Sequence, residues 1–249
     1  MSLKVAIVSA MEREVSPLLK GWTPGTIRDG AKVFGVWRSR SATYIASGIG
    51  REPGILATRA LVASERPDIL ISVGFAGALT RHLHVGETIT PGTVIDGQTG
   101  ERFQAEAGTG VLVSSAEIAD ESDKKQLGEQ YGAEAVDMEG ASVAYVAREH
   151  GIAFCAVKSI SDELGFAMPP FGAYVTAEGR LALERFAAHV AVRPAYWPSL
   201  VQLARNAKKA SLELSAALEH LLSTLTSKKT GVDLRVALAE LTTGARPVN

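Results

Sequence analysis

Carboxylate side chains stand at three places where predicted elements begin or end: Glu14 in "AMEREV", Glu139 in "VDMEG" and Asp162 in "SISDE". Two carboxyl groups on opposite sides of a reacting centre can act as general acid and general base, and one carboxylate can accept hydrogen bonds from two neighbouring hydroxyls. Each acid also has a structural explanation. Asp137 and Glu139 can cap a helix, Glu14 can belong to a charged first helical turn, and Asp162 can bind a strand-end turn. Taken singly, the motifs leave both explanations open.

Alternating strand and helix patterns must position these acids. A β-branched run at 4–9 passes into the helix-compatible segment 11–20, and the glycines of "TYIASGIG" lead into helical spacing at 51–65. The continuously apolar run at 67–79, and the run at 152–163 that ends in polar residues, are typical of buried strands. This rhythm predicts an α/β fold, with a central mixed, mostly parallel twisted β-sheet flanked by helices. Ligands of such sheets bind beyond the carboxyl ends of the strands, so we expect "SAMEREV", "SGIG", "GFAGAL" and "SISDE" to meet at one edge.

The remaining segments complete the predicted organisation. We expect a hairpin or bent strand pair at 83–96, a strand at 110–115 and a solvated helix at 123–132. Residues 1–190 form one α/β domain, and the long amphipathic helical patterns of 191–249 extend that same domain. The basic segment "LARNAKKAS" in this extension fits a solvated helix face better than a membrane-surface or partner contact.

Composition and charge narrow the classes of ligand. The chain of 249 residues is 46% hydrophobic and carries 26 Lys and Arg against 27 Asp and Glu, so nothing favours a nucleic-acid partner and a small ligand is expected. No run is long enough to span a membrane, and acids come too early for a secretory signal, which predicts a cytoplasmic protein. Cys155 lies in an apolar run, where we expect a buried, unreactive thiol. The five histidines show no metal-ligand spacing, and no organic cofactor is implied.

Five stretches occur in an order that resembles one known family. They are "AMEREV" (10–15), "SGIG" (47–50), "SVGFAGAL" (72–79), "VDMEGASVA" (136–144) and "VKSISDE" (157–163). Over about residues 4–190 the chain resembles the nucleoside phosphorylase and nucleosidase superfamily, and most closely the methylthioadenosine/S-adenosylhomocysteine nucleosidases. The resemblance implies a purine nucleoside phosphorylase-like fold and cleavage of the N-glycosidic bond of an adenosyl-type purine nucleoside.

The same resemblance implies a role for each matching residue. Glu139 would grip the ribose hydroxyls, with Met138 packed beneath the sugar. A carboxylate suits the vicinal diol of ribose and discriminates against deoxy sugars. Asp162 would protonate the leaving purine, with Ser161 helping to position it, and Glu14 would activate water on the opposite face of the sugar, as in inverting glycosidases.

Departures from the family pattern bear on the substrate. Phe75 stands where the nucleosidases usually carry a serine or threonine, and Ile118 lies near the place of their purine-stacking aromatic residue. Purine-nucleoside chemistry is therefore better supported than adenine specificity. The apolar loop after Asp162 can cover the surface or line a pocket for the 5′ substituent, and with the long tail it also resembles the hopanoid-associated phosphorylase branch. That loop contains Phe166, Met168, Phe171 and Tyr174.

Hydrolysis is favoured over phosphorolysis, because a carboxylate at Glu14 would repel bound phosphate. Arg13 and Arg51 keep phosphate open as a co-substrate, although we expect the side chain of Arg13 to point away from Glu14. A nucleoside-binding protein without turnover, its water or phosphate site blocked by Phe75, is the alternative from another class. The resemblance further implies a homodimer.

Overall fold

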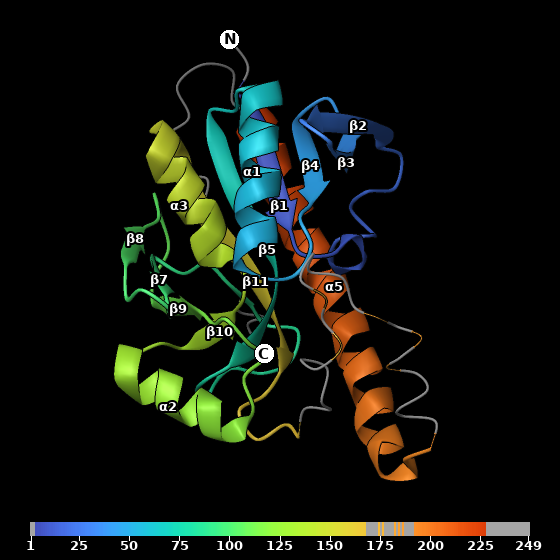
Figure 1. Cartoon of the computed structure of the whole chain (residues 1–249), viewed down its shortest axis with the longest axis vertical. Helices are drawn as coiled ribbons and strands as arrows, with labels where there is room; N and C mark the ends of the chain where they lie inside the picture. The colour runs from blue at the N-terminus through green and yellow to red at the C-terminus, as the bar shows by residue number, and fades with distance from the viewer. Residues whose placement is uncertain are drawn as a thin grey trace.

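The computed structural model describes residues 3–167, 174, 176, 182, 184, 186 and 192–227. Within these residues, eleven strands form one sheet and the helices pack around it (Figure 1). The strands are β1 (Val5–Ser9), β2 (Thr23–Asp29), β3 (Lys32–Arg38), β4 (Ala42–Ala46), β5 (Ile69–Ala78), β6 (Thr88–Ile89), β7 (Thr93–Asp96), β8 (Arg102–Gln104), β9 (Val111–Ser114), β10 (Ala135–Asp137) and β11 (Ala153–Asp162). The helices are α1 (Arg51–Glu65), α2 (Glu121–Tyr131), α3 (Gly140–His150) and α5 (Trp197–Ser227), with single 3-10 turns η1 (Glu12–Glu14) and η3 (Pro194–Tyr196).

The centre of the sheet is parallel. Strand β5 lies between β1 and β11 and is parallel to both, and β1 is also parallel to β4. Strand β9 is parallel to β7 and β10, whereas β2, β3, β6 and β8 join by antiparallel pairing and β10 runs antiparallel to β5. The predicted mixed sheet is confirmed. Its parallel centre brings the carboxyl ends of β1, β5 and β11 to one edge.

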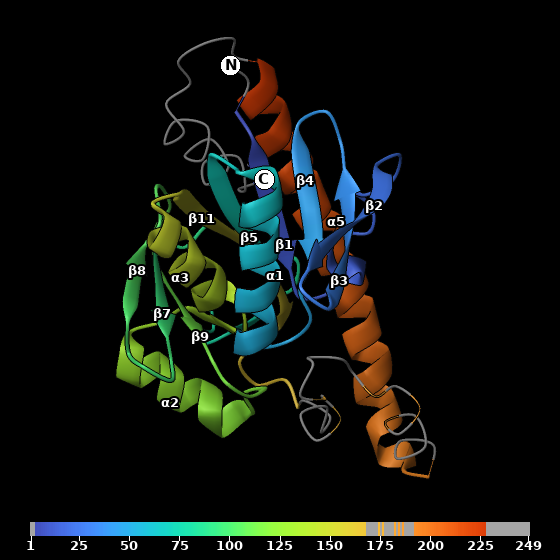
Figure 2. The ribbon, with the colours of Figure 1, turned by 45° about the horizontal axis from the view of Figure 1, so that its top comes forward.

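Helices cover both faces of this sheet. Helices α1 and α3 lie side by side on one face, and α5 crosses the other (Figure 2). The close approach of α1 to α3 needs Gly54, because a Cβ there would lie 2.9 Å from the Cβ of Ser142. On α5 the buried residues Leu214, Leu218 and Leu221 recur at helical spacing and pack with residues of β1, β5 and β11. The amphipathic helix predicted in the C-terminal extension is therefore present.

Some predictions for individual segments are confirmed and others are wrong. The segment 11–20 contains only the turn η1, and Pro17 supplies a reason, since proline lacks an N–H and disfavours helical geometry in the residue before it. The two strands within 83–96 do not form a hairpin with each other: β6 pairs with β11, and β7 pairs with β8 and β9. The strand predicted at 110–115 is β9. Cys155 is buried as expected, and burial raises the pKa of its thiol to about 12.

Candidate active site

A cavity of about 200 Å³ opens at the carboxyl edge of the sheet. Its walls come from η1, from the ends of β5, β10 and β11, from the start of α2 and from α5. All seven residues predicted for the site line it, although they are spread over most of the domain: Glu14, Phe75, Ile118, Met138, Glu139, Ser161 and Asp162. The structure therefore brings together every residue that the motif comparison selected.

Glu14 is buried and held by two backbone donors. Its Oε2 accepts a hydrogen bond from the Met11 N–H at 2.9 Å, and its Oε1 accepts one from the Phe75 N–H at 3.2 Å. Burial raises the pKa of Glu14 above its ordinary value, while these two N–H groups oppose the shift. A buried carboxyl group with a raised pKa and a fixed orientation is suited to accept a proton near neutral pH.

Glu139 contacts the start of another helix rather than capping its own. Its Oε1 accepts a hydrogen bond from the Gly50 N–H at 2.7 Å, and Gly50 precedes the first residue of α1. Burial is the main cause that raises the pKa of Glu139 to about 8, and the negative charges of Asp137 and Glu14 add to it. This shift favours the protonated carboxyl group, which can both donate and accept hydrogen bonds.

Asp137 has the capping role expected for it, together with a partner that the sequence analysis missed. Its Oδ2 accepts a hydrogen bond from the Gly140 N–H at 2.8 Å at the start of α3, and its Oδ1 accepts one from the Ser114 hydroxyl at 2.6 Å. The ammonium of Lys158 lies 2.7 Å from Oδ2 and also donates to the Ser72 hydroxyl at 3.0 Å. Buried ions need such partners, so Lys158 stabilises the buried Asp137 carboxylate in the cavity wall.

Asp162 is paired with Lys124, a second buried lysine that the sequence analysis missed. Lys124 was expected on a solvated helix, yet its side chain is only 2% exposed and its ammonium donates to Oδ2 of Asp162. It also donates to the Glu163 carbonyl at 2.9 Å, and the hydroxyl of Ser161 donates to Oδ1 of Asp162 at 2.6 Å. One signal was available: Lys124 lies three residues before Leu127, on the half-buried side of α2.

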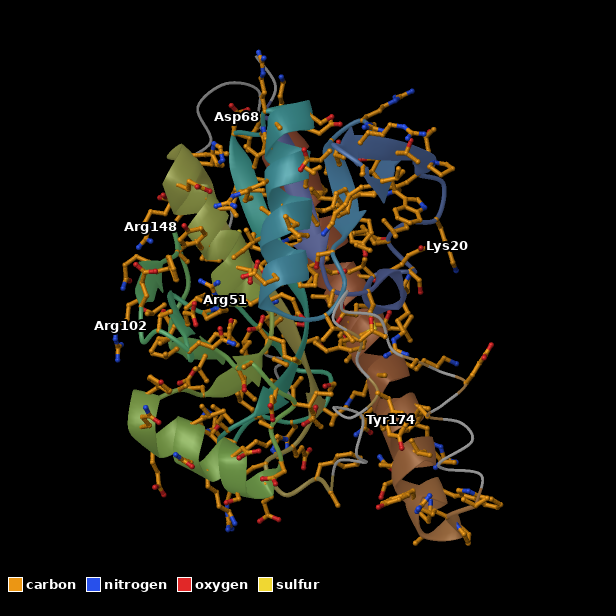
Figure 3. The ribbon with its side chains drawn as sticks, viewed as in Figure 1. Lys20, Arg51, Asp68, Arg102, Arg148 and Tyr174 are labelled. Atoms are coloured by element: carbon orange, nitrogen blue, oxygen red, sulfur yellow. The ribbon has the colours of Figure 1, made fainter. Side chains whose placement is uncertain are left out.

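The two arginines behave differently from expectation. Arg13 was expected to point away from Glu14, but it lines the cavity together with it, because η1 is a single turn with no longer helix to direct the side chain. Arg51, labelled in Figure 3 near the start of α1, pairs instead with Asp96 at 3.1 Å and with Glu52 at 3.3 Å. Arg13 is therefore the arginine at the cavity.

Only part of the apolar loop after Asp162 lies within the described residues. Phe166 and Tyr174, the latter labelled in Figure 3, are not among the described residues that line the cavity. Met168 and Phe171 lie outside the described residues. Among the residues that the structure describes, no cluster of three or more His, Cys, Asp and Glu side chains could hold a metal ion, and no helix is long and apolar enough to cross a membrane.

The structure combines a mixed α/β sheet, helices on both faces and a cavity at the strand ends lined by acids. In folds of this class, small ligands bind at this edge of the sheet. The family model described as the phosphorylase superfamily matches residues 4–120 and 97–193. The chain belongs to this superfamily.

Relatives with assigned names fall among the nucleosidases. The chain is 27% identical to a 5′-methylthioadenosine/S-adenosylhomocysteine nucleosidase of Shewanella oneidensis over 220 residues, which cover 71% of this chain and 92% of the relative. It is also 27% identical to an aminodeoxyfutalosine nucleosidase of Helicobacter pylori over 196 residues, which cover 64% of this chain and 85% of the relative.

Known structures share the fold. The methylthioadenosine/S-adenosylhomocysteine nucleosidase of Colwellia psychrerythraea, in complex with adenine, aligns with a TM-score of 0.70 at 19% identity, over 93% of this chain and 99% of that one. The 5′-methylthioadenosine nucleosidase of Arabidopsis thaliana aligns with a TM-score of 0.71 at 16% identity, over 92% and 98%. The purine nucleoside phosphorylase-like fold expected from the sequence is confirmed.

Proposed function

We propose that this protein hydrolyses the N-glycosidic bond of an adenosyl-type purine nucleoside and releases adenine. The observation that carries the proposal is the placement of two acids along β5. Glu14 contacts this strand at Gly74 and Phe75, and Asp162 lies against Gly77. Three residues of strand span ~10 Å, so the two acids have room for a sugar ring and a water molecule between them.

Each group then has a chemical task. Glu14 takes a proton from the attacking water, and the Asp162 end of the cavity supplies a proton to the departing purine. Glu139 binds the ribose hydroxyls beside Met138, while Ile118 lies against the base. The nucleosidase names of the relatives support this reaction class.

Phosphorolysis is the second candidate, and the position of Arg13 favours it. A guanidinium at the cavity could hold a phosphate co-substrate against the sugar. Two observations support hydrolysis instead: Glu14 faces the same space, and Arg51 is engaged by Asp96. A binding protein without turnover is the remaining alternative, with Phe75 filling the water site.

A second hollow of about 600 Å³ runs from the cavity along α5 and supports a substrate with an apolar 5′ substituent. The two hollows share Arg13, Phe75, Leu203 and Ala207, and Leu200 and Leu212 continue the apolar lining. Such a groove fits the thioether group of methylthioadenosine and would also accept the larger apolar group of a hopanoid-linked adenosyl substrate. A homodimer and a cytoplasmic location stay predictions.

The test is purine release from methylthioadenosine, S-adenosylhomocysteine and adenosine, each with and without phosphate, with the base and the sugar product both quantified. Hydrolysis predicts adenine and free sugar at a rate that does not depend on phosphate. A strict need for phosphate, with a sugar 1-phosphate as product, would transfer the protein to the phosphorylases. Tight binding of a nucleoside without any product would identify a binding protein.

A further inference from the structure

The Lys124–Asp162 pair occupies the end of the cavity that receives the purine in the proposed function. Lys124 reaches it from α2, whereas Asp162 ends β11, and the side chains are 2% and 6% exposed. Both pack against Gly77, where an added Cβ would lie 2.9 Å from Oδ2 of Asp162 and 3.0 Å from Cε of Lys124. The close fit holds the ammonium and the carboxylate at defined positions in the cavity wall.

Both oxygens of Asp162 are already hydrogen-bond acceptors. Oδ1 accepts from the Ser161 hydroxyl, and Oδ2 accepts from Lys124. Each oxygen keeps a second lone pair, but a proton on either one would remove the negative charge that pairs with the Lys124 ammonium. The arrangement therefore suits Asp162 as a carboxylate that holds its neighbour.

Lys124, by contrast, has a donor to spare. An ammonium group has three N–H donors and no acceptor. Two of them are used by Asp162 and the Glu163 carbonyl, and the third has no acceptor among the described residues of the chain. Since Lys124 lines the cavity, this third N–H is available to a bound ligand.

We propose that Lys124 is the catalytic residue that donates a proton to N7 of the departing purine, and that Asp162 is a positioning residue that holds Lys124. This inference rests on the proposed function and changes one role within it, because the resemblance assigns the proton to Asp162 itself. N7 is a pure acceptor, so a group that only donates matches it.

The proton balance of the reaction closes with these residues. As the C1′–N9 bond breaks, its electron pair moves into the purine ring, and N7 takes a proton from the Lys124 ammonium. Water adds its oxygen to C1′ and gives a proton to Glu14. Lys124 is left as a neutral amine and Glu14 as a carboxylic acid. Transfer of one proton from Glu14 to Lys124 through solvent restores the enzyme, and the net change is the addition of water across the C1′–N9 bond.

Four variants separate a donor from a structural lysine. Lys124→Met removes the ammonium at nearly constant length. Lys125→Met is the matched control, because Lys125 is the next residue of α2 but is 56% exposed and pairs with Glu121 at 2.7 Å on the surface. The double variant K124M/D162N removes both charges of the buried pair, and its comparison with Asp162→Asn isolates the loss of Lys124 if Lys124→Met alone does not fold.

Two measurements are made on each folded variant. The first is the turnover of methylthioadenosine. The second is the affinity for adenine and for 7-deazaadenine by calorimetry, since the deaza compound replaces N7 by a C–H group and loses only that acceptor. A lysine that merely supports the fold would change both affinities equally.

The proposal expects Lys124→Met to lower turnover by about 100-fold or more, the usual contribution of a general acid. In the wild type and in Lys125→Met, 7-deazaadenine should bind roughly 10-fold more weakly than adenine, the value of one good hydrogen bond. In Lys124→Met that difference should disappear. If Lys124→Met does not fold, the difference should be kept in Asp162→Asn and should disappear in the double variant.

A variant lacking Lys124 that still prefers adenine by the wild-type ratio, or a wild type that binds both bases equally, would overturn the assignment. Turnover by Lys124→Met within about 3-fold of wild type would also overturn it, because a general acid contributes far more. Failure of the proposed function looks different: the wild type would release no purine, while the adenine preference and its loss in Lys124→Met would still establish the contact with N7.

Discussion

The carboxylate of Glu14 lies directly against Gly74 of β5. A Cβ on residue 74 would lie 3.2 Å from Oε1 and 3.3 Å from Oε2, and the φ of +143° at this glycine is one that other residues rarely adopt. Gly74→Ala should therefore shift Glu14, reduce turnover and destabilise the protein by roughly 1–3 kcal/mol. Turnover and urea unfolding check this, with Gly35→Ala as control, because a Cβ there meets only Trp37 at 3.6 Å. Equal behaviour of the two variants would contradict the expectation.

Glu139 should make stability depend on pH. Its ordinary pKa of 4.5 is raised to about 8 in the folded chain. Between these values the folded chain binds more protons than the unfolded chain, so stability is greatest below pH 4.5 and falls as pH rises through 8, by up to roughly 1.4 kcal/mol per pH unit. Glu139→Gln should flatten this part of the profile. Urea unfolding from pH 5 to pH 8 measures it, and parallel profiles for variant and wild type would show that Glu139 is not the source.

Glu139 should also be the residue that recognises the ribose hydroxyls of the substrate. Glu139→Gln keeps an oxygen for the Gly50 N–H but replaces the other oxygen by an NH2 group, which cannot accept a hydrogen bond from a ribose hydroxyl. We expect ribonucleoside affinity, measured at pH 5, to fall by about 10-fold or more while the melting temperature at that pH changes little, and 2′,3′-dideoxy analogues should lose almost nothing. Calorimetry with paired ribo and dideoxy ligands distinguishes the outcomes. Equal losses for both ligands would leave Glu139 a purely structural role.

The Lys158–Asp137 pair should be worth more to stability than a surface ion pair. Lys158→Met leaves Asp137 buried without its cation, a change that costs about 3–5 kcal/mol in comparable sites. The double variant K158M/D137N should recover part of this loss, because it leaves no buried charge unpaired. Chemical unfolding gives both values. A loss below about 1 kcal/mol in Lys158→Met, the scale of an exposed pair, would contradict this account.

Local pattern and chain order were enough to predict much of the fold. The apolar spacing of Leu214, Leu218 and Leu221 predicts an amphipathic helix, and the apolar strands ending in glycines or acids predict a site at the sheet edge. Glu14 and Asp162 were selected because family motifs keep their order along the chain, and the structure places both at one cavity.

The buried lysines could not be predicted in the same way. Lys124 resembles a surface residue, and Lys158 lies within a run predicted as a buried strand, but neither position indicates its partner. Those partners come from distant segments: Asp162 lies 38 residues after Lys124. Local spacing carries no information about such charge pairing. The segment 11–20 forms only the short turn η1 and not the longer helix with which its sequence is compatible. Its polar residues suit a helix, but Pro17 prevents one.

The measurement that tests the account most directly compares Glu14→Gln with Glu12→Gln in phosphate-free buffer, following adenine release from methylthioadenosine alongside the affinity for adenine. Glu12 belongs to the same turn but is exposed, whereas Glu14 is 4% exposed at the cavity. The account predicts adenine and free sugar from the wild type, a loss of about 100-fold or more in Glu14→Gln with adenine binding retained, and turnover within about 2-fold of wild type in Glu12→Gln. Full turnover by Glu14→Gln, or no adenine release by the wild type, would contradict it.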